Sequence, residues 1–293
     1  MTSSLSANTR LKLEQTLGQW SHWRCHPALP GAPHIEKVLG GGISNHSVLV
    51  STADQRFVVR IDGINPAANG INRQNEWYAL RQAHEAGLAP CPRYFNPELG
   101  ALVCDYLQPD DRQKHELGDV ASLLRDIHQL PPSHHRLDIS ERIRRYERTS
   151  RTVANANQVS LRNCRGLVWS ILAELRDDPT PPVLCHNDLL TANRLVSGSK
   201  LWALDWEYSA MASPWCDLAF IINGDELTAE QTEELVEHYL YRAATLKERL
   251  LLQGYLSACR YLELLWYQSQ SHADLDGESA KRKLAALIAG LNS

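Results

Sequence analysis

The stretch His186-Asn187-Asp188-Leu189-Leu190-Thr191-Ala192-Asn193, followed twelve residues later by Asp205-Trp206-Glu207, decides which fold this sequence can be assigned to. A carboxylate such as Asp188 can align a hydroxyl group and accept its proton. Magnesium prefers hard oxygen ligands and takes only one or two carboxylates from a protein. The amide oxygen of Asn193 and the carboxylate of Asp205 fit this preference. Taken alone, Asp188 is also what a turn or a helix cap would show. The three polar residues together favour a general base followed in sequence by a magnesium site.

His186 and Cys185, two and three residues before Asp188, also carry groups capable of chemistry. We expect His186 to support the loop rather than to react, because its imidazole can hydrogen-bond the backbone. Cys185 invites interpretation as a nucleophile, but a small apolar residue at the end of a buried strand is the simpler interpretation. The seven cysteines are scattered and form no Cys-x-x-Cys pair, which favours a reduced compartment.

The bulk composition excludes several classes of protein. With 293 residues, 43% hydrophobic and 22% charged, the chain can form one large domain or two lobes. A formal net charge of −4 leaves no general basic field for nucleic acid. No apolar run approaches the roughly 18 residues of a membrane span, and the polar segment Met1 to Arg10 lacks the apolar core of a signal peptide. We therefore expect a cytoplasmic protein that binds neither nucleic acid nor membrane.

The residue pattern changes near residues 106–112 and predicts an α+β fold. Before this point, short apolar stretches predict a small sheet and one helix over 72–86, which ends at Gly87. The predicted strands are 35–39, 47–51, 56–61 and 101–106. An amphipathic helix before residue 35 is expected from Leu5, Leu11, Leu13, Leu17 and Trp20.

After Pro109 the apolar residues recur mostly at helical spacing. The predicted helices are 117–130, 140–157 and 162–175, and the chain beyond Asp217 is expected to be mostly helical. A strand over 183–186 and a hairpin closed at 197–199 interrupt this pattern. The arginines of the basic helix around residues 142–151 most simply form a solvated face.

A glycine-rich loop precedes a strand cation. Gly40-Gly41-Gly42-Ile43-Ser44-Asn45 lies between two predicted strands, where missing side chains let backbone N–H groups approach phosphates. A tight turn alone would explain the same glycines. Arg60, on the next strand, could contact phosphates and pair with a helix carboxylate, for which Glu76 is the best candidate. By itself, Arg60 is more typical of a charge on a surface strand than of a phosphate ligand.

These motifs together resemble the choline/ethanolamine kinase and aminoglycoside phosphotransferase superfamily, which shares the protein-kinase fold. The matching segments, in order, are Gly41-Gly42-Ile43-Ser44-Asn45, Phe57-Val58-Val59-Arg60, His186 to Asn193, Leu204-Asp205-Trp206-Glu207-Tyr208 and Asp217-Leu218-Ala219. The resemblance spans about residues 35 to 270. An arginine at position 60, where protein kinases have lysine, is typical of the choline kinase branch.

The resemblance implies a bilobal fold and a set of roles. A small antiparallel-sheet N-lobe is expected over 1–106 and a larger, mostly helical C-lobe over 107–293, with ATP and Mg²⁺ as cofactors. Asp188 would be the catalytic base, Asn193 and Asp205 the metal ligands, and His186 and Asp217 supporting residues. The nucleotide would be bound by Gly41, Gly42, Ser44, Asn45, Arg60, Glu76, Asp105 and Leu107.

The resemblance also points to a small cationic alcohol as substrate. Glu207, Tyr208 and Trp266 are the expected substrate-binding residues, because aromatic faces and carboxylates attract a cation. Glu263 stands where the family has one tryptophan of a pair, and Gly224 where it has a choline-binding glutamate. Both departures argue against a complete choline cage. For Trp266, a place in a buried helix face is an equally good interpretation.

Four functional hypotheses remain open from the sequence. Choline or a related amino alcohol is the first substrate class, and thiamine the second. An aminoglycoside kinase ranks lower, because a polycation needs a dense acidic cluster that the C-terminal segment lacks. A catalytically inactive kinase-like protein that binds a metabolite or another protein is the alternative from a different class.

Overall fold

The computed structural model describes residues 5–40, 45–63, 66, 69–149, 156–269 and 277–291. Two compact units account for the chain. Unit 1 comprises Met1–His115 and Ala192–Ser209, and unit 2 comprises Glu116–Thr191 and Ala210–Ser293. The glycine loop positions Gly41, Gly42 and Ser44 lie outside the described residues.

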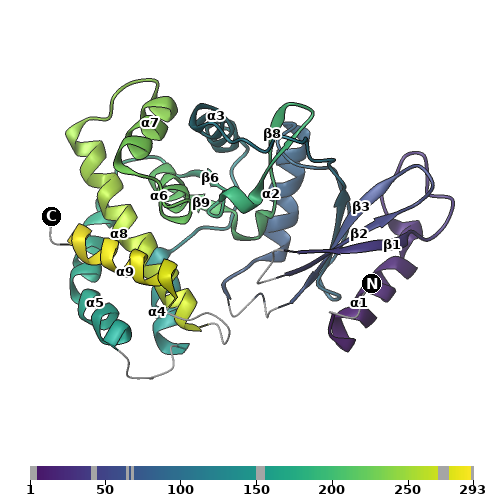
Figure 1. The fold of residues 1–293 in the computed structure, drawn as a ribbon, viewed down its shortest axis with the longest axis horizontal. Coiled ribbons are helices and arrows are strands. Elements are labelled where there is room, and N and C mark those ends of the chain that lie inside the picture. Colours follow the sequence, from purple (N-terminus) through teal and green to yellow (C-terminus); the bar gives the residue numbers. More distant parts are fainter. Residues whose placement is uncertain are drawn as a thin grey trace. The chain divides into compact units, whose positions relative to one another are not determined.

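An antiparallel sheet is the centre of unit 1 (Figure 1). Its strands are β1 (His34–Leu39), β2 (Asn45–Ser51), β3 (Arg56–Asp62), β4 (Pro92–Asn96) and β5 (Ala101–Asp105), in the order β1-β2-β3-β5-β4. The predicted strands therefore form, while β4 was not predicted. Its register shift between Pro92 and Tyr94 breaks the alternation by which a strand is found in a sequence.

Helices cover the sheet of unit 1 on both faces, and strand alternation separates an apolar face from a charged one. On one face Phe57, Val59 and Ile61 of β3 are buried in a core cluster with Leu13 and Trp23, against α1 (Ala7–Gly18). On the other face Arg60 contacts α2 (Arg73–Glu85). The predicted apolar stripe of α1 is wrong at one position, because Leu11 is 53% exposed.

A hairpin from later in the chain completes unit 1. It consists of β7 (Arg194–Ser197) and β8 (Lys200–Ala203), with η4 (Thr191–Asn193) before it and η5 (Trp206–Tyr208) after it. The N–H of Ala203 donates to the carbonyl of Leu88, and Asp110 accepts the N–H groups of Gly198 and Ser199. These bonds group residues 192–209 with the N-terminal sheet, whereas the sequence suggested the contiguous lobes 1–106 and 107–293.

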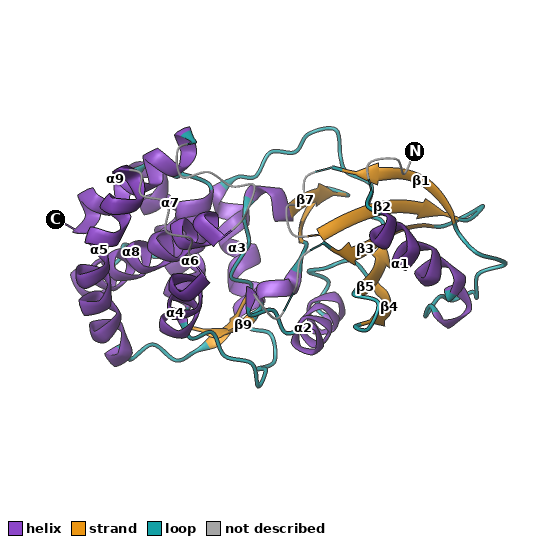
Figure 2. Cartoon of the chain, turned by 90° about the horizontal axis from the view of Figure 1, so that it is seen from below, coloured by secondary structure: helices purple, strands orange, loops and turns teal. Residues whose placement is uncertain are grey.

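Unit 2 is almost entirely helical (Figure 2). Its helices are α3 (Leu117–His128), α4 (Ile139–Thr149), α5 (Ala156–Glu174), α6 (Pro214–Gly224), α7 (Ala229–Leu240), α8 (Leu246–Ser269) and α9 (Glu278–Leu291), with the short η3 (Leu175–Asp177). The central α8 packs against α4, α5, α6 and α9. Tyr261 and Leu264 of α8 are buried in the core cluster of this unit.

A two-stranded pair lies within unit 2 and positions the loop that contains Asp188. The strands are β6 (Val183–Cys185) and β9 (Ala210–Ala212). Of these, β6 was predicted and the three-residue β9 was not. The helix boundaries between 140 and 175 also differ from prediction, since α5 begins at Ala156. None of the helices in the described ranges is both long and apolar enough to span a membrane. The expected α+β class, with a five-stranded antiparallel sheet and many helices, is confirmed.

Candidate active site

A buried ion pair joins the sheet of unit 1 to its helix α2. Arg60 donates through Nη2 to Oε2 of Glu76 at 2.9 Å and through Nη1 to Oε1 of the same carboxylate. Bidentate pairing of this kind is geometrically specific as well as strong. Burial alone would lower the pKa of Arg60, but the carboxylates of Glu76 and Asp205 outweigh it and raise that pKa well above its ordinary value. The pairing of Arg60 with Glu76 that the sequence suggested is confirmed.

Asp205, the expected metal ligand, lies at the end of the same network. Its Oδ1 accepts a hydrogen bond from Nη1 of Arg60 at 3.0 Å, and its side chain is 31% exposed. The backbone of Asp205 is left-handed, with φ of 58°, which is uncommon for a residue other than glycine. Burial and the nearby Glu207 carboxylate raise the pKa of Asp205 above its ordinary value. A cation beside this carboxylate would favour its ionised form.

Asn193, the other expected metal ligand, is joined to the same backbone segment. The N–H of Leu204, directly before Asp205, donates to the carbonyl of Asn193 at 2.8 Å. This bond brings the chain positions of the two candidate ligands beside each other within unit 1. An amide and a carboxylate are hard oxygen donors, which suits Mg²⁺.

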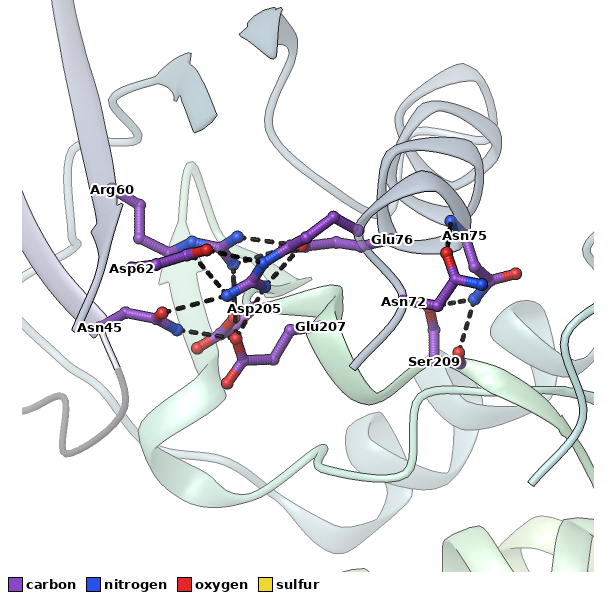
Figure 3. A network of polar contacts seen from close by, with 10 residues as sticks. Asn45, Arg60, Asp62, Asn72, Asn75, Glu76, Asp205, Glu207 and Ser209 are labelled. Atoms are coloured by element: carbon purple, nitrogen blue, oxygen red, sulfur yellow. Dashed lines mark hydrogen bonds and ion pairs between the residues drawn. The ribbon is translucent and has the colours of Figure 1, made fainter. Parts of the chain in front are cut away.

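Arg73 is a second buried arginine that the sequence interpretation missed. Its side chain is 8% exposed and contacts Asp62, Glu76 and Glu207. Figure 3 shows the carboxylates that converge here from β3, α2 and η5. Sequence alone offered only one signal, a cation at the start of a helix, where the helix dipole makes a cation unfavourable.

Asn45 and Glu207 belong to this network too. Nδ2 of Asn45 donates to Oε2 of Glu207 at 2.8 Å, and Nη1 of Arg73 donates to the same oxygen at 2.9 Å. The Glu207 side chain is only 2% exposed. We expected Glu207 at the substrate and Asn45 at the nucleotide, whereas the structure pairs these two side chains with each other.

The charges of the network fit a divalent cation. Two guanidinium groups, Arg60 and Arg73, face four carboxylates when all are ionised, which leaves an excess of two negative charges. The four carboxylates are Asp62, Glu76, Asp205 and Glu207. Burial, the largest influence, raises the pKa of Asp62 as well. Like charges held this closely favour a bound cation or a bound proton.

Unit 2 contains the loop that carries Asp188. Asp188 is partly exposed, and its carbonyl accepts the N–H of Leu190 at 2.8 Å. The preceding Asn187 is left-handed, with φ of 60°. The fully buried Asp217 holds this segment, because its two oxygens accept the N–H groups of His186 at 2.7 Å and Asn187 at 2.8 Å. The contacts of Asp217 thus fit the supporting role expected for it.

His128 and Tyr239 extend this support, and the sequence interpretation missed both. Nε2 of His128 lies 3.2 Å from Oδ2 of Asp217, and its Nδ1 lies 2.8 Å from the hydroxyl of Tyr239. Burial alone would raise the pKa of Asp217, but its hydrogen bond and charge interaction with His128 outweigh burial and lower that pKa. A chain of side chains therefore connects α7 and α3 to the backbone beside Asp188.

Cys185 ends the strand β6 and is completely buried. Its thiol donates to the carbonyl of Ala212 at 3.7 Å. Burial raises the pKa of this thiol well above its ordinary value, which makes it a poor nucleophile. Its position and pKa fit the structural interpretation of Cys185.

The two expected adenine-binding residues lie at the end of β5. The carboxylate of Asp105 is held by Arg93, at 2.6 Å from Nε and 2.7 Å from Nη2, and its N–H donates to the carbonyl of Cys91. Leu107 follows the strand and is partly buried. Among the described residues, Leu107 has no hydrogen-bonding partner. A free backbone amide just beyond the end of a strand is suited to pairing with the edge of a base.

The aromatic residues expected at the substrate come from separate elements. Tyr208 lies in η5 of unit 1 and is partly buried. Trp266 lies in α8 of unit 2 and packs against the core there. Its ring is edge-on to the ring of Tyr267, with the two ring centroids 5.3 Å apart. Glu263, on the same helix, is paired with the buried Lys283 of α9. Lys283 therefore already compensates the negative charge of Glu263.

A comparison with known families identifies the chain. A model described as a phosphotransferase enzyme family matches residues 36–252. The chain belongs to this family. The matched segment contains the expected catalytic and metal-binding residues and stops before Trp266.

Individual relatives within this family are distant. Protein LicA of Haemophilus influenzae is 27% identical over 210 residues, which is 68% of this chain and 61% of that protein. Thiamine kinase of Escherichia coli O157:H7 (strain EC4115 / EHEC) is 28% identical over 217 residues, 72% of this chain and 73% of that protein. The match thus covers less than two thirds of the length of the Haemophilus protein.

Among solved structures, the choline kinase LicA from Streptococcus pneumoniae resembles this chain with a TM-score of 0.72 and 25% identity. The likeness covers 88% of this chain and 94% of that one. It confirms the expected protein-kinase-like fold, with its antiparallel sheet and its helical part.

Proposed function

We propose that the protein is a kinase that transfers the γ-phosphoryl group of ATP to the hydroxyl of a small cationic alcohol. The observation that carries this proposal is the network of Arg60, Glu76 and Asp205, in which a buried cation pairs with a helix carboxylate and with the expected metal ligand. Phosphoryl transfer needs positioning and charge neutralisation more than covalent help from the protein.

Each residue of the site has a defined role in this proposal. Asp188 orients the substrate hydroxyl and accepts its proton as the oxygen attacks phosphorus. Asn193 and Asp205 would hold Mg²⁺, which would supply positive charge to neutralise the phosphates of ATP. Arg60, held in place by Glu76, contributes a fixed positive charge near the phosphates. Asp217 and His186 keep the loop of Asp188 in its conformation.

The nucleotide contacts also remain proposals. The glycine loop with Gly41, Gly42 and Ser44 would cover the phosphates, and Asn45 links the end of that loop to Glu207. The backbone at Asp105 and Leu107 would bind adenine. Support for this comes from the family and from the unpaired backbone of Leu107.

Choline or a related amino alcohol is the first substrate class and thiamine the second. Tyr208 and Trp266 would supply the aromatic faces that attract a quaternary or thiazolium cation. The similarity to a choline kinase and to a thiamine kinase supports both classes. Because Glu207 and Glu263 are paired with Arg73 and Lys283, we place the recognition of positive charge on the aromatic faces rather than on these carboxylates.

ADP release with Mg·ATP tests the function directly. The substrates are choline, ethanolamine, thiamine and kanamycin, and Asp188→Asn serves as the blank. Turnover with one alcohol that disappears in D188N supports the proposal and names the substrate. Turnover with kanamycin alone would move the protein to the aminoglycoside kinases. If ATP bound but none of these compounds were phosphorylated, the fold assignment would stand and the search would move to other alcohols.

A further inference from the structure

Arg73 occupies a position that is unfavourable for a cation on two grounds. It is the first residue of α2, where the positive end of the helix dipole repels a guanidinium group. Its side chain is also 8% exposed, and a buried charge is costly unless it is paired. The contacts of Arg73 must therefore offset both costs.

Those contacts distribute the four carboxylates of the network over two arginines, which share Glu76. Arg73 donates to Oδ1 of Asp62 at 2.5 Å, to Oε2 of Glu76 at 2.7 Å and to Oε2 of Glu207 at 2.9 Å. Arg60 donates to Glu76 and Asp205, and its nearest approach to Glu207 is 4.0 Å. Arg60 thus binds the candidate metal ligand Asp205 directly. Arg73 instead binds Glu207, two residues further along the chain.

The left-handed backbone conformation of Asp205 must be held by contacts of the residues on either side of it. A left-handed residue other than glycine costs about 1–3 kcal/mol and persists only where its surroundings hold it. Upstream of Asp205, Leu204 is hydrogen-bonded to Asn193. Downstream, the Glu207 carboxylate is bound by Arg73 and by Asn45, which Figure 3 shows beside it. Without Arg73, the Glu207 carboxylate would keep the Asn45 amide at 2.8 Å, but its nearest described cation would be Arg60 at 4.0 Å.

We infer that Arg73 is a positioning residue for the metal site, acting through Glu207 to hold the backbone conformation of Asp205. The inference rests on the proposed function, because it takes Asp205 as a metal ligand. Outer partners of metal ligands orient them, and their loss lowers metal affinity by roughly 10–100-fold. Arg73 does not touch the reacting atoms in this scheme.

Binding of Mn²⁺ with ADP, followed by the EPR signal of free Mn²⁺, tests the inference without turnover. Arg73→Lys keeps the charge but loses the forked donor geometry that reaches three carboxylates at once. We expect R73K to bind Mn²⁺ about tenfold more weakly than the wild type. The matched control is Arg81→Lys on the same helix, which among the described residues forms an ion pair only with the exposed Glu85, at 3.7 Å. Its Mn²⁺ affinity should equal that of the wild type.

A double-mutant cycle with Glu207→Gln separates positioning from simple structural support. If Arg73 acts through Glu207, R73K should weaken Mn²⁺ binding much less in the E207Q background than in the wild type. A lower unfolding temperature for R73K with unchanged Mn²⁺ affinity would overturn the inference, as would equal Mn²⁺ losses in both backgrounds. Should R73K fail to fold, E207Q alone decides, because unchanged Mn²⁺ affinity in that variant leaves Arg73 nothing to act through.

The same experiment separates this inference from the proposed function. If the wild type binds no Mn²⁺ with ADP, the proposed metal site is wrong and the inference falls with it. If the wild type binds Mn²⁺ and R73K binds it equally well, only the inference is wrong. A weaker affinity in R73K supports the inference whichever alcohol the enzyme phosphorylates.

Discussion

Nη1 of Arg60 lies 3.0 Å from Oδ1 of Asp205, although 145 residues separate them in the chain. The same guanidinium holds both oxygens of Glu76. The strand β3, the helix α2 and the turn at Asp205 are therefore coupled through one buried cation. Within unit 1, a change at any of these three side chains should alter the other two.

Replacing Asp188 by Asn tests its role as general base. We expect kcat to fall by roughly 10²–10⁴-fold, because the amide can still contact the hydroxyl but cannot accept its proton. Binding of ATP, measured by displacement of a fluorescent nucleotide, should persist. The control is Asp126→Asn, an exposed carboxylate of α3, which should leave kcat unchanged. A wild-type kcat for D188N would show that Asp188 is not the base.

Replacing Glu76 by Gln should destabilise unit 1. Glu76 is 1% exposed and accepts hydrogen bonds from both Arg60 and Arg73. Removing one partner of a buried ion pair costs about 3–5 kcal/mol, so calorimetry should show a clearly lower unfolding temperature. Glu85→Gln on the exposed side of the same helix is the matched control. Equal unfolding temperatures for the two variants would refute the importance of this pair.

Asp217 should contribute stability that depends on pH. The pKa of Asp217 in the folded protein lies below its ordinary value, which is about 3.9 for an unfolded aspartate. A lowered carboxyl pKa stabilises the folded state above that ordinary value, and the contribution disappears as the pH falls through the folded pKa.

Asp217→Asn should therefore unfold at a lower temperature than the wild type near neutral pH. The difference between the two proteins should stay nearly constant down to about pH 4 and shrink below it. Thermal unfolding across this range is the measurement, with the exposed Asp177→Asn as a control that changes little. A difference that grows in acid would contradict the lowered pKa.

Trp266 is predicted to bind the cationic part of the substrate. An aromatic face contributes up to about 2 kcal/mol to a desolvated cation, so Trp266→Ala should raise the KM for the alcohol about tenfold with little change in kcat. Trp169→Ala is the control, since Trp169 packs against the same core from α5. If both variants lose stability but neither changes KM, Trp266 is only a core residue.

Many features of this protein can be predicted from patterns within short segments of its sequence. Asp188, Asn193 and Asp205 lie close enough in sequence for their order to indicate the chemistry, and helical spacing marks α3 without any tertiary information. The strands β2, β3 and β5 were predicted because their apolar residues cluster between turn signals. The short β9 was missed, since three residues cannot show a period.

The sequence did not show which side chains contact each other in the site. Glu207 was expected at the substrate because a carboxylate attracts a cation, yet its carboxylate contacts Arg73, 134 residues away. His128 looked like one residue of an amphipathic helix, and only the fold brings it to Asp217.

The sequence by itself determined the family motifs, the α+β class and the candidate base and metal ligands, because each depends on neighbours within a few turns or one hairpin. Only the tertiary structure decided that Arg73 shares Glu76 with Arg60, that Glu207 lies within this network, and that Asp217 supports the loop of Asp188. The physical reason is range. Ion pairs and hydrogen bonds act over a few ångströms in space, and separation along the chain does not reveal which groups the fold brings within that distance.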